Sequence, residues 1–197
     1  MGVGNWAREH PYTGKVNSAD KSQNAQAAAV RRIVLTGFMG SGKTTVGPLL
    51  ARRLGWSFID TDDVIAAEAG CSIPEIFTRD GEAAFRALEH AAIERLASSD
   101  ALVLALGGGA IELEATRLLL LAGSGTLLVH LEVELVTALA RCRGTEHLRP
   151  VLADEANLAS RYARRLPLYR TAHFTIPVDS LTPEQVVEAI AHAAQLA

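Results

Sequence analysis

A glycine-rich segment that begins at Gly37 has the residue types and spacing to bind the phosphates of a nucleotide. Its pattern, Gly37-x-x-x-x-Gly42-Lys43-Thr44, matches the phosphate-binding loop and lies between a predicted strand and a predicted helix. Glycines let backbone N–H groups turn toward one anion, and the helix adds its positive end. Lys43 would reach the β- and γ-phosphates, and the Thr44 hydroxyl would bind Mg²⁺. The alternative, a glycine-rich turn that binds nothing, is disfavoured by the strand-then-helix context.

The use of lysine supports this interpretation of the loop. Lysine occurs only at positions 15, 21 and 43, whereas arginine is used freely. The only lysine after residue 21 therefore stands where the loop meets the phosphates. The planar fork of arginine would be a poor substitute there for a compact ammonium group.

Two aspartates are candidates for the carboxylates that such a site needs. The apolar run 101–106 is followed by three glycines, so it supplies no acid, whereas the predicted strand 57–60 ends in Asp60-Thr61-Asp62-Asp63. If this segment stays extended, Asp60 and Asp62 point in one direction at the ligand-binding end of the sheet. Asp60 could then serve Mg²⁺ and Asp62 a substrate hydroxyl. The alternative is that Asp62 or Asp63 caps the next helix, and we expect Asp63 to do so.

Two clusters suit an acceptor that is an anion. Arg86 and Glu89 are three residues apart on one predicted helix face, so the acid can hold the guanidinium, although such a pair is usually an exposed ion pair. Gly107-Gly108-Gly109 removes side chains where a substrate could approach the backbone, or it is only a flexible turn.

Two arginine-rich segments follow. The run 140–152 contains Arg141, Arg143 and Arg149 between two predicted helices, where a mobile lid could lie. An arginine on a closing lid can neutralise a phosphoryl group in transfer, although a basic loop is more often only solvated. Arg164 and Arg165 stand at a predicted helix end, where both could simply interact with the helix dipole.

Strands and helices alternate along the chain, which predicts an α/β fold with a parallel sheet covered on both faces. The predicted strands are 33–36, 57–60, 102–106, 126–131 and 174–177. Capping-box spacing predicts helix starts at Ser72-x-x-Glu75 and at Thr182-x-x-Gln185. Pro48 should kink or open the helix that follows the loop, because it cannot donate to the Thr44 carbonyl.

Composition narrows the class of protein. The 197 residues suffice for one α/β domain, which we place at 31–197, after a polar and flexible extension at 1–30 with a short helix near 24–30. A net charge of −3 favours neither nucleic acid nor an anionic membrane. The chain has two separate cysteines, no membrane-spanning run and no signal peptide, so we expect a cytoplasmic protein.

Taken in order, these clusters resemble the shikimate kinase family over about residues 32–190. The resemblance rests on the segments 37–47, 60–62, 72–77, 81–89, 107–109, 149–152 and 165–169. It implies a three-layer α/β/α sandwich of the P-loop NTPase type, with a central five-stranded parallel sheet. It also implies ATP-dependent phosphorylation of the shikimate 3-hydroxyl, in the pathway to chorismate and the aromatic amino acids.

The resemblance also implies roles for individual residues and partners. Asp62 would bind the reacting hydroxyl and accept its proton, Arg86 and Arg165 would grip the substrate carboxylate, and Arg141 would pack on adenine. The implied catalytic residues are Lys43, Asp62 and Arg149, with Arg149 on a lid at about 143–153. ATP would be bound by Gly40, Ser41, Gly42, Lys43, Thr44, Thr45, Arg141 and Arg149. The substrate would be bound by Asp62, Arg86, Gly107, Gly108, Gly109 and Arg165, and Mg²⁺ by Thr44 and Asp60. We expect a monomer that binds ATP and shikimate.

Two alternatives remain at this stage. Gluconate kinases share the loop and an acid on the second strand, but they match the triple glycine and the Arg165-x-Pro-Leu-Tyr segment less well. A ligand-sensing module could use the same fold without turnover, since fold does not fix function. Such a module would be favoured by loss of Lys43, Asp62 or the lid arginine, and all three are present.

Overall fold

A computed structural model describes residues 29–143 and 155–196 of the chain. Several sequence-based expectations lie outside these ranges: most of the N-terminal extension with its short helix, most of the expected lid, and Arg149. The proposed division into an extension, a domain and a lid therefore stays a prediction.

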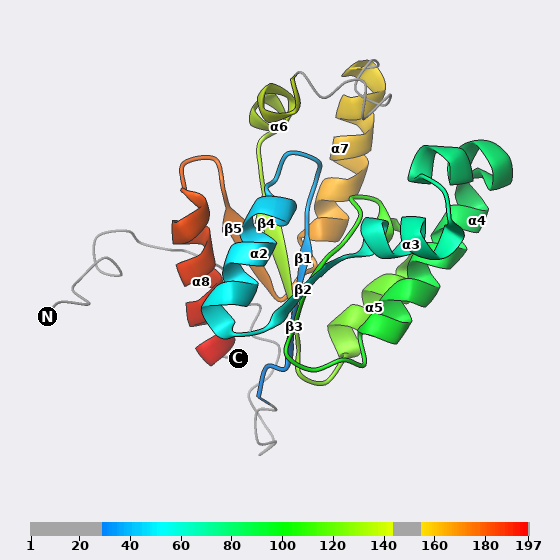
Figure 1. Cartoon of the computed structure of the whole chain (residues 1–197). Coiled ribbons are helices and arrows are strands. Elements are labelled where there is room, and N and C mark those ends of the chain that lie inside the picture. The colour runs from blue at the N-terminus through cyan, green and yellow to red at the C-terminus, as the bar shows by residue number, and fades with distance from the viewer. Residues whose placement is uncertain (1–28, 144–154, 197) are drawn as a thin grey trace, which may run out of the picture.

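The centre of the fold is a sheet of five parallel strands in the order β2-β3-β1-β4-β5 (Figure 1). The strands are β1 (Arg32–Thr36), β2 (Ser57–Asp60), β3 (Leu102–Ala105), β4 (Thr126–Glu132) and β5 (Phe174–Pro177). In the middle of the sheet Val34 pairs with Leu104 on one side and with Leu128 on the other. These three side chains are at most 1% exposed. The expected parallel sheet is confirmed by this pairing. Its strands are continuous apolar runs because helices cover both faces of the sheet.

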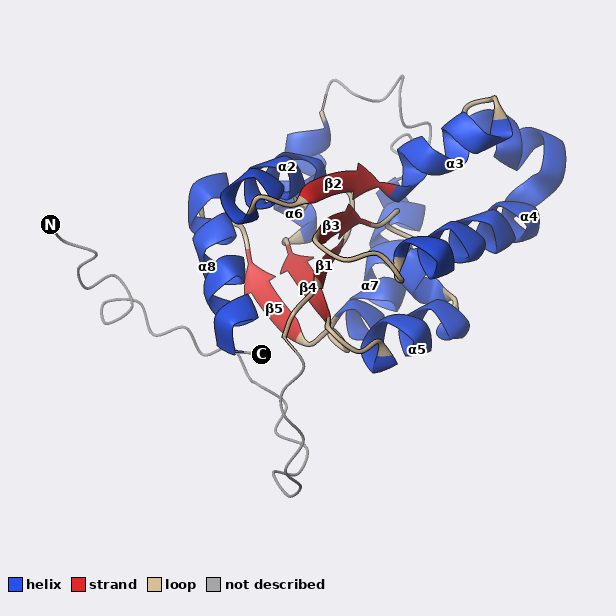
Figure 2. Cartoon of the chain, turned by 60° about the horizontal axis from the view of Figure 1, so that its bottom comes forward, coloured by secondary structure: helices blue, strands red, loops and turns tan. Residues whose placement is uncertain are grey.

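Helices form a layer on each face of the sheet (Figure 2). One layer holds α2 (Lys43–Leu54) and α8 (Pro183–Leu196), which pack against each other. The other holds α3 (Thr61–Ala69), α4 (Ile73–Leu96), α5 (Glu114–Ala122) and α7 (Glu155–Tyr169). The helix α6 (Leu135–Cys142) lies beyond the carboxyl ends of the strands, and the short 3₁₀ turn η1 (Ala110–Glu112) precedes α5. The loops that carry the chemistry therefore meet at one edge of the sheet.

Local signals placed the helix starts well. Glu75 accepts hydrogen bonds from the backbone N–H and the hydroxyl of Ser72. At the other cap the bonds are reciprocal: the Thr182 N–H donates to the Gln185 side chain, and the Gln185 N–H donates to the Thr182 hydroxyl. Of the two effects expected at Pro48, an opened turn is wrong, since α2 runs through it as one helix, and a kink stays a prediction. Gly81 instead interrupts a helix, because its φ of 82° divides α4 into two parts.

No helix in the described part of the chain is both long enough and apolar enough to span a lipid bilayer.

Candidate active site

The glycine-rich segment forms a loop between β1 and α2. Gly40 and Gly42 have φ angles of 73° and 93°, in the left-handed region that glycine adopts at little cost. An added Cβ at Gly40 would lie 2.8 Å from the carbonyl oxygen of Ala138, so α6 also restricts this position. The Lys43 ammonium donates to the carbonyl oxygens of Gly37, at 2.8 Å, and Phe38, at 3.2 Å. The loop thus has the backbone conformation that turns N–H groups toward an anion.

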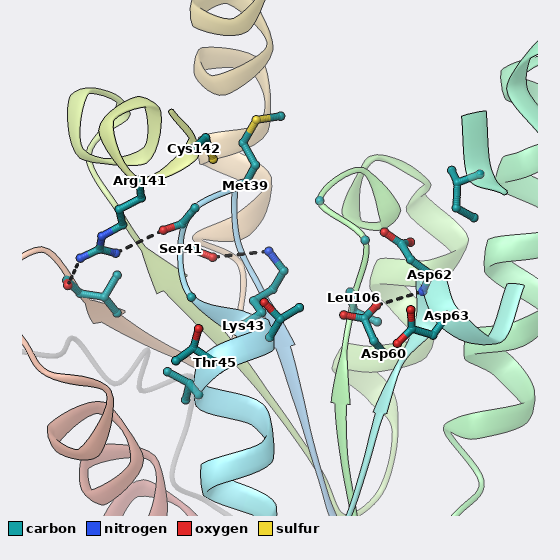
Figure 3. Close-up of a pocket in the computed structure, with 18 of the residues that line it drawn as sticks. Met39, Ser41, Lys43, Thr45, Asp60, Asp62, Asp63, Leu106, Arg141 and Cys142 are labelled. Atoms are coloured by element: carbon teal, nitrogen blue, oxygen red, sulfur yellow. Dashed lines mark hydrogen bonds between the residues drawn. The ribbon is translucent and has the colours of Figure 1, made fainter. Parts of the chain in front are cut away.

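A cavity of about 1140 Å³ extends from this loop to the first turn of α3. Lys43 lies on one side of it, and Asp60 and Asp62 lie on the other, as Figure 3 shows; Thr44 also lines the cavity. The residues are brought together because β1 and β2 are parallel, with β3 between them, so both strands end at the same edge of the sheet. A cavity of this size can hold a nucleotide together with a small acceptor.

The acidic segment differs from our expectation in its local geometry. It does not stay extended, because α3 already begins at Thr61. The cap is Asp60 rather than Asp63: Oδ1 of Asp60 accepts a hydrogen bond of 3.0 Å from the backbone N–H of Asp62. An aspartate at the N-cap satisfies an unpaired N–H of the first helical turn, which favours an early helix start. Asp60 and Asp62 still face the cavity, now from a strand end and a helix start.

Burial changes the acidity of both carboxyl groups. It raises the pKa of Asp62, and neighbouring Asp60 raises it further, while Lys43 and Arg86 act in the opposite direction. Burial is also the main cause of the raised pKa of Asp60. A carboxylate with a raised pKa is a stronger base, so Asp62 is suited to accept a proton.

Arg86 and Glu89 form a pair that is largely removed from solvent. Nη1 of Arg86 donates to Oε2 of Glu89 at 2.7 Å, and the Glu89 side chain is only 2% exposed. Burial raises the pKa of Glu89 to about 7. The alternative of an ordinary exposed ion pair is therefore wrong. A buried acid that holds an arginine so closely sets the direction of the guanidinium.

The three glycines after β3 have different surroundings. An added Cβ at Gly107 would lie 2.7 Å from Oδ1 of Asp62 and 2.7 Å from Oε1 of Glu89. At Gly109 it would overlap the guanidinium of Arg86, whereas at Gly108 the nearest atoms are 3.7 Å away. Gly107 and Gly109 therefore leave room for side chains of the site itself, and only Gly108 has space beside its backbone.

We expect Gly107→Ala to lower catalytic efficiency at least about 10²-fold, because a displacement of order 1 Å at a reacting group has an effect of that size. Gly55→Ala is the control and should stay within about fivefold, because Gly55 ends α2 away from the cavity and nothing lies within 4 Å of an added Cβ, so its left-handed φ affects stability rather than catalysis. Steady-state kinetics on both variants, with circular dichroism as a check of folding, measures the difference. Equal losses in the two variants would contradict this account of the glycines.

Arg165 is held inside the site, which the sequence did not establish. It lies on α7, is 6% exposed and lines the cavity, so it is more than a partner of the helix dipole. Its Nη2 donates to Oε2 of Glu112 at 2.7 Å. Sequence reasoning missed Glu112. The available signal was an acid three residues after the triple glycine, at the same sheet edge as the arginines.

Two arginines were expected to bind ATP, and the described residues include one of them, Arg141. Arg141 lines the cavity from α6 and donates to the carbonyl oxygens of Gly40 and Val178, which ties α6 to the loop (Figure 3). Its expected packing on adenine stays a prediction. Arg149 lies outside the described residues.

The fold and the cavity together define a class of protein: a P-loop phosphotransferase that acts on a small molecule. The glycine-rich loop suits a nucleotide, and the acids and arginines across the cavity suit an acceptor with a hydroxyl and a carboxylate. The comparisons with known proteins specify the family. The profile described as shikimate kinase matches residues 39–195, and the chain belongs to the shikimate kinase family.

Relatives and solved structures agree with this assignment. The chain is 42% identical over 166 residues to a shikimate kinase of Salinibacter ruber, covering 79% of this chain and 80% of that protein. It is 44% identical over 161 residues to a shikimate kinase of Thermobifida fusca, covering 80% and 91%. The structure of shikimate kinase from Acinetobacter baumannii in complex with shikimate superposes with a TM-score of 0.79 at 36% identity, covering 86% of this chain and 95% of that one.

Proposed function

We propose that this chain transfers the γ-phosphoryl group of ATP to the 3-hydroxyl of shikimate, giving shikimate 3-phosphate and ADP. The observation that carries the proposal is that Lys43 and Asp62 line opposite sides of one cavity in a member of this family. A terminal phosphate at the loop and a hydroxyl at Asp62 would then meet within that cavity.

In the proposed reaction the hydroxyl oxygen of the acceptor attacks the γ-phosphorus. The new O–P bond forms as the bond from the γ-phosphorus to the bridging oxygen of ADP breaks. Asp62 accepts the hydroxyl proton, and Lys43 with the loop N–H groups neutralises the charge on the phosphates. Since the transition state of phosphoryl transfer is loose, most of the rate increase would come from positioning and electrostatic stabilisation.

The acceptor carboxylate would be bound by Arg86 and Arg165, with Gly108 offering its backbone between them. Arginine forks suit a planar carboxylate because they donate two parallel hydrogen bonds. The burial of Glu89 and its 2.7 Å bond to Arg86 support a role in aiming that guanidinium. Gly107 and Gly109 would contribute mainly by leaving room for the side chains of Asp62, Glu89 and Arg86.

The residues near the loop fit Mg²⁺ bound together with ATP. Thr44 and Asp60 offer hard oxygen ligands on the same cavity. Within residues 29–143 and 155–196, no cluster of three metal-binding acids, histidines or cysteines occurs. This agrees with a magnesium ion that takes one or two protein ligands and completes its shell with phosphates and water. Bound there, the ion would neutralise phosphate charge.

Three further statements belong to the proposal: the enzyme works as a monomer, it resides in the cytoplasm, and it binds neither nucleic acid nor membrane. The net charge of −3 supports the last of these.

The experiment that tests the proposal measures ADP release from ATP and Mg²⁺ in the presence of shikimate, of gluconate or of no acceptor. We expect release that depends on shikimate and stays at background with the other two. Equal rates with and without shikimate would reject the acceptor, and a faster rate with gluconate would reassign it.

A further inference from the structure

The carboxylate of Glu112 is hydrogen-bonded to Arg165 and lies near Arg86, the two arginines that the proposed function assigns to the substrate carboxylate. Its Oε2 accepts a hydrogen bond from Nη2 of Arg165 at 2.7 Å and lies 3.9 Å from Nη2 of Arg86. One oxygen of the protein thus stands between both guanidinium groups. Burial raises the pKa of Glu112, but the hydrogen bonds and charges of Arg165 and Arg164 together lower it by more, so the carboxylate remains ionised.

The backbone that carries Glu112 is held in place independently of this contact. The η1 turn closes with a bond of 2.9 Å from the Glu112 N–H to the Gly109 carbonyl. Arg117 donates to the carbonyl oxygens of Ile111 and Glu112 at 2.7 and 3.0 Å. The carboxylate therefore reaches the arginines from a fixed turn, directly after the triple glycine.

Arg165 does not depend on Glu112 for its position. Its side chain is 8% exposed, and its Nη1 lies only 3.7 Å from where a Cβ on Gly108 would be, so burial already restricts it. The main effect of Glu112 at this place is its charge. A negative charge within a few ångströms of an anion-binding site weakens that site unless the charge moves away.

A second partner for Glu112 lies just outside the site. Its other oxygen, Oε1, accepts bonds of 2.9 and 2.7 Å from Nε and Nη2 of Arg164, whose side chain is 63% exposed. If Oε2 leaves Arg165, the carboxylate still keeps a two-point contact with Arg164. Arg164 therefore lowers the cost of displacing Glu112 from the site.

From this arrangement we propose that Glu112 competes with the substrate carboxylate for Arg165 and Arg86, and that Arg164 retains Glu112 when the substrate takes its place. The inference rests on the proposed function, since it takes those arginines to be the site of the acceptor carboxylate. On this inference, Glu112 controls how strongly an acceptor that carries a carboxylate binds.

The test is the steady-state kinetics of the full chain and three variants with shikimate. Glu112→Gln should lower KM for shikimate about 10-fold, because it removes a competitor whose charge-assisted bond contributes roughly 1.5 kcal/mol. Arg164→Gln should raise KM about threefold or more, because Glu112 then stays on Arg165. The double variant should behave as Glu112→Gln does, since Arg164 acts only through Glu112. The kcat should stay within about twofold of the wild-type value in all three.

Two controls separate competition from a general structural effect. Glu114→Gln removes the same charge from an exposed position at the start of α5 and should leave KM unchanged. An acceptor with a hydroxymethyl group in place of the carboxylate should show the same KM with wild type and Glu112→Gln. The double variant loses one negative and one positive charge, so its net charge equals that of the wild type. If Glu112→Gln alone does not fold, comparing the double variant with Arg164→Gln still measures the effect of Glu112.

An unchanged or raised KM for shikimate in Glu112→Gln would overturn the inference, as would an equal fall in KM for the hydroxymethyl acceptor. A rise in KM from Arg164→Gln that persists without Glu112 would overturn the part assigned to Arg164. These outcomes all require that the wild type turns over shikimate, so failure of the proposed function itself would appear as absent turnover in the wild type.

Discussion

Asp62→Asn is expected to lower kcat about 10³-fold while ATP binding stays within twofold. The side chain keeps its shape but no longer accepts the hydroxyl proton, and general-base catalysis contributes about 10²–10⁴-fold. Since Asp62 lies across the cavity from the phosphate-binding loop, its loss should not disturb the nucleotide. Steady-state kinetics with shikimate and ATP titration by calorimetry measure the two effects.

The matched control is Asp63→Asn, on the same turn of α3 but exposed. It should retain most of the activity. A pH profile adds a second readout: because burial raises the pKa of Asp62, the rate should fall on acidification at a higher pH than an ordinary aspartate would give. Weakened ATP binding in Asp62→Asn, or equal losses in both variants, would contradict its assignment as the base.

Lys43→Met should lower kcat about 10²–10³-fold, the effect seen when one preorganised donor to a developing charge is removed. The ammonium lies at the start of α2 and bonds to the carbonyl oxygens of Gly37 and Phe38, so it is already held inside the loop. Lys43→Arg should not restore the rate, although it restores the charge, because a planar guanidinium does not fit where a compact ammonium does.

Arg52→Gln serves as the charge control for Lys43, since Arg52 is exposed near the other end of the same helix. It should leave kcat within twofold. Single-turnover measurements on Lys43→Met, with ATP saturating, distinguish slower transfer from weaker binding. Full activity in Lys43→Arg would show that charge alone suffices at this position.

Much of the fold was predictable because its signals are local. Burial of β1 on both faces makes it a continuous apolar run, and the Ser72–Glu75 and Thr182–Gln185 capping boxes mark helix starts. The phosphate-binding loop combines both kinds of signal with glycine spacing. Patterns of this kind involve residues only a few positions apart, so they can be recognised from the sequence alone.

The acidic segment shows where local reasoning went wrong. Alternation along an extended chain placed Asp60 and Asp62 correctly at the cavity, but the helix starts one residue after Asp60, and Asp60 itself is the cap. Several residues in a row could each have capped α3, and the choice among them depends on how β2 ends against β3. Spacing alone does not contain that information.

The sequence did not predict the burial of Glu89 either. A pair at i and i+3 on a helix looks the same in the sequence whether it faces solvent or the sheet. Only the tertiary packing, which brings its carboxylate against Gly107, decides that Glu89 is 2% exposed, and this burial raises its pKa to about 7.

By itself the sequence determined the class of fold, the phosphate-binding loop and the types of side chain at the site, because strand periodicity, capping and glycine spacing are properties of short segments. The tertiary structure alone decided which of those side chains meet. Glu112 and Arg165 are 53 positions apart, yet one carboxylate oxygen is bonded to Arg165 and lies 3.9 Å from Arg86 beside the triple glycine. Such contacts depend on how helices that are far apart in the sequence pack around the sheet, and no pattern within a short segment specifies that packing.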